Sequence, residues 1–150
     1  MEVAALQIKR APNDYSDFGP VDLDRECEST YYKNYRLVSA FVAAEMGVDD
    51  ADTAGVALRP LLEGHLHRRF PGAIPDGVML GEALSRIADA TTPSPLVHAQ
   101  HHVPELRTIN AFAGKFHHDT NPDRMTFRPD PTAVVTYARR VLNFIHGASV

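Results

Sequence analysis

Apolar residues recur at intervals of three and four along most of this 150-residue chain, a spacing that places them on one face of an α-helix. The clearest run spans about residues 23–46, and Gly47 follows it as a helix C-cap. Its apolar positions are Tyr31, Tyr35, Val38, Val42 and Met46. The pattern predicts a long amphipathic helix that buries this face.

Later segments repeat the pattern between breaks that contain proline or glycine. The predicted helices cover about residues 49–70, 79–90, 104–118 and 131–145. Pro60 lies inside the first of them, so that helix is expected either to kink or to begin at the proline. The expected buried positions of the last three are Leu80, Leu84, Ile87, Leu106, Ile109, Ala113, Phe116, Val134, Ala138, Val141 and Ile145. A mainly α fold follows, with four longer helices and a short one in a bundle, and with residues 96–103 as a loop.

The N-terminal part has a different pattern. Residues 3–9 alternate loosely between apolar and polar, which predicts a short strand or extended segment, and a turn-rich stretch follows it. A lone strand has no evident partner in a small helical domain. We therefore predict an extended segment over residues 1–22 and a helical domain over residues 23–150.

Composition limits the classes of function. Fifteen Lys and Arg against nineteen Asp and Glu give a formal net charge of −4, so a nucleic acid would have to bind a local basic patch. Cys27 is the only cysteine, which excludes an internal disulfide and favours a reducing, cytoplasmic compartment. No apolar run is long enough to cross a membrane, and no P-loop, GxSxG or dinucleotide-binding pattern occurs. No membrane partner and no cofactor are therefore expected.

Polar and ionisable residues interrupt two of the predicted helices at helical spacing. Arg59, Glu63 and His67 are four residues apart along one stripe. Asn110 and His117 are seven apart along a stripe of another helix. If the stripes face each other, they combine a guanidinium that grips phosphate, a carboxylate, and an imidazole that transfers protons near neutral pH. These groups are candidates for phosphodiester chemistry without a metal.

Plainer interpretations of the same residues stay open. Arg59 and Glu63 also suit an intrahelical ion pair, and His117 also suits a structural hydrogen bond. A metal site is disfavoured, because His65 and His67 point in different directions on a helix and no HExxH spacing occurs. The other side chains weighed as ligands are Glu63, His117, His118 and Asp119.

Basic residues beside the two stripes form a candidate RNA-binding patch. His67, Arg68 and Arg69 lie at the end of the second predicted helix. Lys115 and His118 lie at the end of the fourth and supply a possible second half. A solvated, charged helix end is the alternative meaning of such residues.

Residues 27–35, 58–71 and 109–118 carry a resemblance to a known family. They resemble the C-terminal helical region of ABC/SMC-like AAA ATPases of bacterial defence systems. The best-known branch is the PrrC/RloC anticodon nucleases, whose C-terminal part is a HEPN-like ribonuclease. Residues 2–35 resemble the end of such an ATPase domain, which would account for the lone strand.

The resemblance implies a fold, a chemistry and partners. Its Arg-x3-Glu pair matches Arg59 and Glu63, and its downstream histidine matches His117 or, as the second choice, His118. The implied activity is metal-independent cleavage of tRNA or another structured RNA by the neighbouring 2′-hydroxyl, within a phage-defence or toxin system. A homodimer and an ATPase domain or subunit are the implied partners.

One departure from the pattern keeps a second function open. The compact Arg-x4-6-His motif of many HEPN nucleases is absent from the fourth predicted helix, where Asn110 and His117 stand seven apart instead. The alternative is a non-catalytic helical module that mediates dimerisation or regulation of a defence ATPase.

Overall fold

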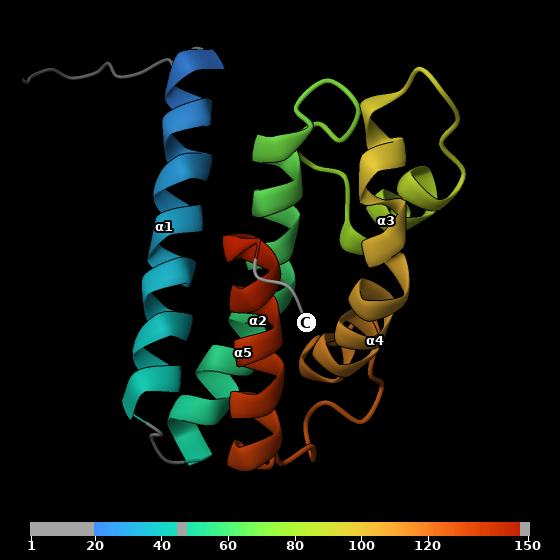
Figure 1. Ribbon diagram of the computed structural model, residues 1–150. Coiled ribbons are helices and arrows are strands. Elements are labelled where there is room, and N and C mark those ends of the chain that lie inside the picture. The colour runs from blue at the N-terminus through green and yellow to red at the C-terminus, as the bar shows by residue number, and fades with distance from the viewer. Residues whose placement is uncertain (1–19, 45–47, 148–150) are drawn as a thin grey trace, which may run out of the picture. The chain divides into compact units, whose positions relative to one another are not determined.

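The structure is a computed structural model that describes residues 20–44 and 48–147. Its helices are α1 (Pro20–Ala44), α2 (Val48–Arg69), α3 (Leu80–Ala88), α4 (Val103–Ala113) and α5 (Pro131–His146), with the 3-10 helices η1 (Pro95–His102) and η2 (Gly114–Phe116) (Figure 1). The described residues contain no strand, so the predicted mainly α fold with five helices is confirmed. The strand predicted within residues 3–9 lies outside the described residues.

The chain divides into two units, residues 1–30 and 31–150. In the first unit the structure describes the beginning of α1, from Pro20. The second unit holds the remainder of α1 and all the other helices. All the contacts given below lie within this second unit.

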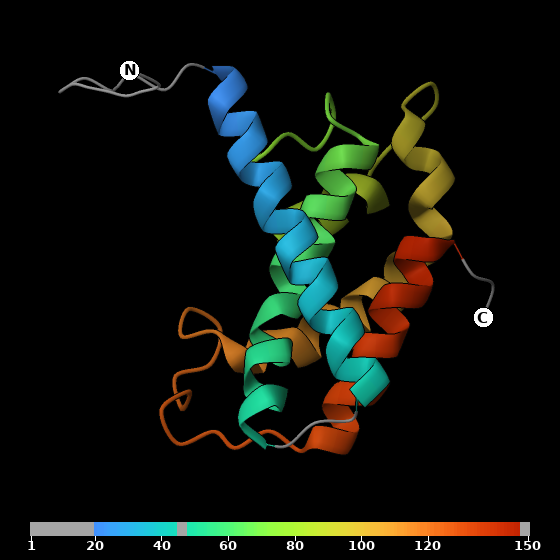
Figure 2. The same ribbon diagram turned by 90° about the vertical axis from the view of Figure 1, so that its left-hand side faces the viewer.

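Helix α2 is the centre of the second unit. It packs against α3, α4, α5 and η2, and Figures 1 and 2 both show α5 running beside it. Four leucines of α2 have no exposed surface: Leu58, Leu61, Leu62 and Leu66. Because α2 is surrounded on several sides, its few polar side chains are brought against neighbouring elements.

The predicted apolar faces form the core. Leu80, Leu84 and Ile87 of α3 are at most 1% exposed, and the predicted positions of α4 and η2 are at most 2% exposed. On α5, Val134, Ala138 and Val141 are fully buried, whereas Ile145 is only partly so. Phe41 of α1 is also buried, although the predicted stripe of α1 did not include it.

Local caps fix the two ends of α5. The Asp130 carboxylate accepts a hydrogen bond from the backbone N–H of Thr132 at 3.1 Å, and Pro131 occupies the first turn. Gly147 ends the helix with φ +74°, a left-handed conformation that glycine adopts without the cost of a Cβ. The predicted bounds of this helix are therefore confirmed to within one residue.

The helix predicted over 49–70 is confirmed as α2, and of the two alternatives at Pro60 the structure excludes a start there, because the helix begins twelve residues earlier at Val48. Two other predicted boundaries are wrong. Residues 95–102 form η1 instead of a loop, and Ser94 caps that helix by accepting from Leu96 N–H at 3.2 Å. The α-helix predicted over 104–118 ends at Ala113.

The early end of α4 has a physical cause in the loop that follows. Side chains of Thr120, Asn121 and Arg124 donate hydrogen bonds of 2.6, 2.7 and 2.7 Å. The acceptors are the backbone carbonyls of Gly114, Lys115 and Phe116, respectively. In an α-helix that ended at His118, the Gly114 carbonyl would accept from the His118 N–H, and the other two carbonyls would have no donor within the helix. The loop therefore replaces the last turns of the predicted helix.

Candidate functional site

Arg59 is the hub of a polar cluster on α2. Its Nε lies 3.9 Å from Oε2 of Glu63, one helical turn further on, which is the ion pair expected from their spacing. Its two terminal nitrogens donate to the two carboxylate oxygens of Asp119 at 3.3 and 3.4 Å. The Arg59 side chain is only 12% exposed, whereas that of Asp119 is 53% exposed. A planar fork of this kind fits a carboxylate or a phosphate equally well.

Glu63 also holds the start of α3. Its Oε2 accepts a hydrogen bond of 2.7 Å from the backbone N–H of Leu80, the first residue of that helix. Met79 at the N-cap supplies no side-chain bond, so Glu63 takes the place of the missing cap. Burial raises the pKa of Glu63, while the Leu80 N–H and the Arg59 guanidinium lower it. The carboxylate is therefore structural as well as close to the cluster.

His117 reaches the cluster from an extended residue, not from a helix. It follows η2 with φ −126° and ψ 136°, so the prediction that Asn110 and His117 share one helical stripe is wrong. The ring of the preceding Phe116 lies over Gly55 of α2, where an added Cβ would be 2.2 Å from the ring. This close approach fixes the backbone before His117 against α2.

Pro60 supplies the acceptor that orients the His117 ring. A proline has no N–H, so the carbonyl of Val56, four residues earlier, lacks its helical donor. The His117 ring lies against the Val56 backbone, which raises the pKa of the ring. Its Nε2 is buried without a hydrogen-bond partner. We therefore expect Nδ1 to carry the proton and to donate it to the Val56 carbonyl, which leaves a lone pair on Nε2.

The Nε2 atom of His117 is unusual among the described residues. It is the only buried side-chain nitrogen or oxygen in that part of the chain with no hydrogen-bond partner. Burial and the nearby Arg59 guanidinium lower the pKa of His117, while Asp119 and the Val56 bond raise it. A neutral imidazole with a free lone pair is the form that accepts a proton.

Three comparisons tested whether the chain is similar to known proteins. No family model, no curated protein and no solved structure matches it. The chemistry of the site is therefore argued from its own geometry.

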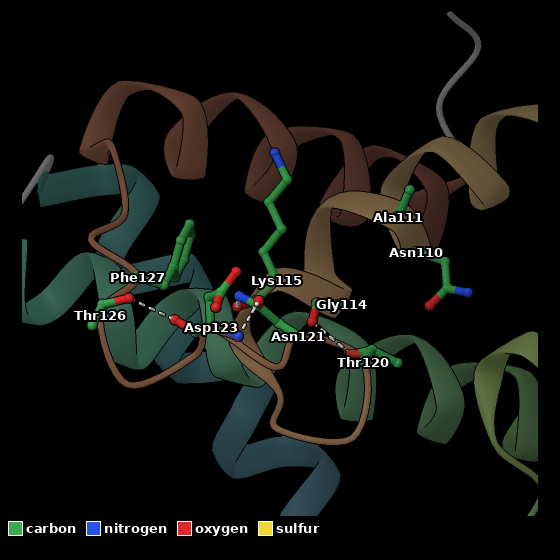
Figure 3. Close-up of a pocket in the computed structure, with 9 residues that line it drawn as sticks. All are labelled: Asn110, Ala111, Gly114, Lys115, Thr120, Asn121, Asp123, Thr126 and Phe127. Carbon is green, nitrogen blue, oxygen red and sulfur yellow. Dashed lines mark hydrogen bonds between the residues drawn. The ribbon is translucent and has the colours of Figure 1, made fainter.

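Asn110 lies near the cluster but does not join it. Its Nδ2 is 3.9 Å from the position a Cβ would take on Gly81, next to the Leu80 that Glu63 caps. It also lines an open pocket between α4 and the following loop (Figure 3). The amide makes no hydrogen bond within the described part of the chain.

The predicted RNA-binding residues do not form one patch. His67 has its Nδ1 3.3 Å from the carbonyl oxygen of Ile74, away from the Arg59 cluster. Arg68 lies 5.1 Å from the ring centres of both Tyr31 and Tyr32, and thereby ties α2 to α1. Arg69 lies 5.2 Å from the Phe70 ring.

Lys115 and His118 are exposed at the other end of α2. There η2 packs at Gly55, thirteen residues before Arg68. A rise of 1.5 Å per residue separates these two points by about 20 Å along α2. The two groups are therefore separate on the surface, and their binding to one RNA stays a prediction.

The described residues form neither a metal site nor a membrane span. No group of three or more His, Cys, Asp or Glu side chains there is arranged to hold a metal ion. None of the described helices combines the length and the apolar character of a membrane span. His65, one of the ligands weighed from sequence, packs edge-on against Phe144 with a ring separation of 5.3 Å.

Sequence reasoning missed three features of this site. It weighed Asp119 only as a metal ligand, because nothing local links it to an arginine sixty residues earlier. It missed Gly55, whose role depends on a ring from another element. The free carbonyl of Val56 could have been predicted from the sequence, since an internal proline always leaves the carbonyl four residues earlier without its helical donor.

Proposed function

We propose that this chain is a metal-independent endoribonuclease domain of a phage-defence or toxin system, HEPN-like in fold and of the PrrC/RloC anticodon nuclease type. The observation that carries the proposal is the buried Nε2 of His117, which has no hydrogen-bond partner, close to the Arg59 guanidinium that lowers the pKa of the ring. The substrate is tRNA or another structured RNA. The resemblance of the sequence to those nucleases supports the same chemistry.

The residues suggest a division of roles. Arg59 grips the scissile phosphate through its fork and neutralises the charge that develops on it. Nε2 of His117, which is buried in this structure, becomes accessible when the substrate binds and accepts the proton of the neighbouring 2′-hydroxyl, and the 2′-oxygen forms a bond to phosphorus. The bond from phosphorus to the 5′-oxygen breaks, and that oxygen takes a proton from solvent. The products are a 2′,3′-cyclic phosphate and a free 5′-hydroxyl.

In the proposed complex, the scissile phosphate takes the place that Asp119 holds beside Arg59 in this structure. The two oxygens of Asp119 take both ends of the Arg59 fork, as two phosphate oxygens would. The distances of 3.3 and 3.4 Å are long for charged partners, and the carboxylate is largely exposed. A substrate phosphate can therefore replace Asp119 without opening the core.

One observation favours a second function, a non-catalytic module that dimerises or regulates a defence ATPase. Glu63 caps α3 through Leu80, and Arg59 is 12% exposed and held by two carboxylates. These contacts are also those of residues whose role is only to stabilise the fold. Under both functions we expect a homodimer, and an ATPase domain or subunit as partner.

The test is incubation of the purified chain with total tRNA in EDTA, followed by mapping of new ends. The variants are Arg59→Ala and His117→Ala, with Arg86→Ala as a matched control, because Arg86 forms an exposed ion pair with Glu82 on α3. Cleavage with cyclic phosphate ends that both site variants lose and the control keeps would support the nuclease. Intact tRNA throughout, from folded wild-type protein, would refute it and favour the regulatory module.

A further inference from the structure

Two adjoining pockets lie on the exposed side of α4. The larger, of about 610 Å³, is bounded by Asn110, Lys115, Thr120 and Phe127 among others (Figure 3). The smaller, of about 430 Å³, is bounded by Arg107 and Tyr137 among others. Ala111 and Lys115 line both pockets, so the two adjoin along α4.

The free polar groups of these pockets are few and of particular kinds. Lys115 and Arg107 have no carboxylate partner among the described residues, and the Asn110 amide has no hydrogen-bond partner there. The other polar side chains of the larger pocket are largely engaged, since Thr120 and Asn121 bond to the backbone of the Gly114–Phe116 helix. A ligand in the larger pocket would therefore meet the Lys115 ammonium, the Asn110 amide and the Asp123 carboxylate, and one that extends into the smaller pocket would also meet Arg107.

The apolar walls of the pockets are aromatic. Phe127 is partly buried and packs edge-on against Phe116 with a ring separation of 5.0 Å. In the smaller pocket, Tyr137 stacks on Phe112 at 4.0 Å with the rings nearly parallel. Aromatic surface, a free amide and an ammonium are the groups that bind the face of a base, its edge and a phosphate.

The larger pocket adjoins the Arg59 cluster through a shared loop. Thr120, which lines the pocket, directly follows Asp119, whose carboxylate contacts Arg59. Figure 3 shows the Lys115 side chain extending away from this loop and from Asp123, toward the ribbon of α5. The one carboxylate that lines the pocket, Asp123, forms no ion pair with Lys115 within the described part of the chain.

The geometry points to the larger pocket as the binding site for one nucleotide of single-stranded RNA, next to the phosphate held by Arg59. Asn110 bonds the edge of the base, and Lys115 contacts the next phosphate, on the side of the smaller pocket. A volume of about 610 Å³ lies within the range of small-ligand sites and suits one nucleotide. This inference rests on the proposed nuclease function and extends it to how the RNA strand is bound.

The test measures binding of a short single-stranded RNA whose 2′-hydroxyls are methylated, so that it cannot be cleaved by the proposed route. Fluorescence anisotropy gives Kd at several salt concentrations. Lys115→Ala removes the cation, whereas Ala111→Phe fills the wall shared by the pockets without changing charge. Lys33→Ala, at an exposed lysine of α1, is the matched control. Circular dichroism and thermal melting check that each variant is folded.

We expect Lys115→Ala and Ala111→Phe each to raise Kd by about tenfold, in line with the 1–3 kcal/mol that one stacked base contributes. Lys115→Ala also lowers the salt slope by about 0.7, the value for one contact to a single-stranded phosphate. Ala111→Phe leaves that slope unchanged, and Lys33→Ala leaves Kd within about twofold of wild type. A Kd of Ala111→Phe equal to that of wild type would overturn the nucleotide pocket. So would a rise in Kd with Lys33→Ala as large as that with Lys115→Ala.

Failure of this inference is distinguishable from failure of the proposed function. If unmodified RNA is cleaved but neither pocket variant changes Kd, the pocket assignment is wrong and the proposed nuclease function is retained. If RNA binds through the pocket but unmodified RNA stays intact, the nuclease is wrong and the pocket stands. Absence of any binding by folded wild type overturns the pocket.

Discussion

Replacing Pro60 with alanine is expected to make the protein more stable and the proposed nuclease less active. The substitution restores a backbone N–H in the middle of α2, four residues after Val56. That N–H competes with the His117 ring for the Val56 carbonyl. The helix gains its missing hydrogen bond, and His117 loses the bond that fixes its tautomer.

The size of the stability change follows from three contributions. Alanine is favoured over proline in a helix interior by about 3 kcal/mol. The loss of one side-chain hydrogen bond reduces this gain by about 1 kcal/mol. Without the proline the unfolded chain has more conformational entropy, which reduces the gain by up to about 1 kcal/mol more. The net expectation is a gain of about 1 kcal/mol. Pro71→Ala, at an exposed turn after α2, should lower stability by less than about 1 kcal/mol.

Urea denaturation measures both stabilities, and ¹⁵N NMR of the histidine rings reports the tautomer. In wild type we expect the proton of neutral His117 on Nδ1, and in Pro60→Ala a mixture of tautomers with a further lowered pKa. tRNA cleavage should fall at the same time. A wild-type His117 protonated on Nε2, or a Pro60→Ala protein with an unchanged tautomer, would refute the argument.

Other substitutions test the packing and the charges. Gly55→Ala forces the Phe116 ring back by about 1.2 Å, from 2.2 Å to the 3.4 Å of ordinary contact. It should lower the free energy of unfolding, measured in urea, by about 1–3 kcal/mol. Gly81→Ala, where the nearest atom is 3.9 Å from the added Cβ, should raise it by up to about 1 kcal/mol. Equal effects of the two would contradict the close approach. Glu63→Ala should cost about 1 kcal/mol of unfolding free energy through the lost cap of α3, and an unchanged urea midpoint would argue against that role. Burial and two arginines lower the pKa of His65 to about 4, so the unfolded chain binds more protons between pH 6.5 and about 4, and stability should fall as pH drops through that range. His65→Leu should flatten this dependence, and an identical pH profile would show that another group causes it.

The helices that the sequence predicts well carry their own local signals. Residues 131–145 combine an apolar stripe, a capping aspartate and a terminal glycine, so their helix needs nothing from the remainder of the chain to be recognised. The predicted helix over 104–118 shows the limit of such signals. Its apolar positions are buried as expected, but the α-helix ends at Ala113, and side chains from Thr120 to Arg124 donate to the carbonyls of the residues that follow.

The sequence by itself determined the mainly α class, the buried faces and the pairing of Arg59 with Glu63, because periodicity, caps and neighbours one turn apart are local properties. Only the tertiary structure decided what that pair meets. Asp119 reaches Arg59 because the loop turns back after η2, and η2 lies there because the Phe116 ring fits over Gly55. Contacts between segments sixty residues apart depend on how helices pack, and no periodicity within either segment encodes them.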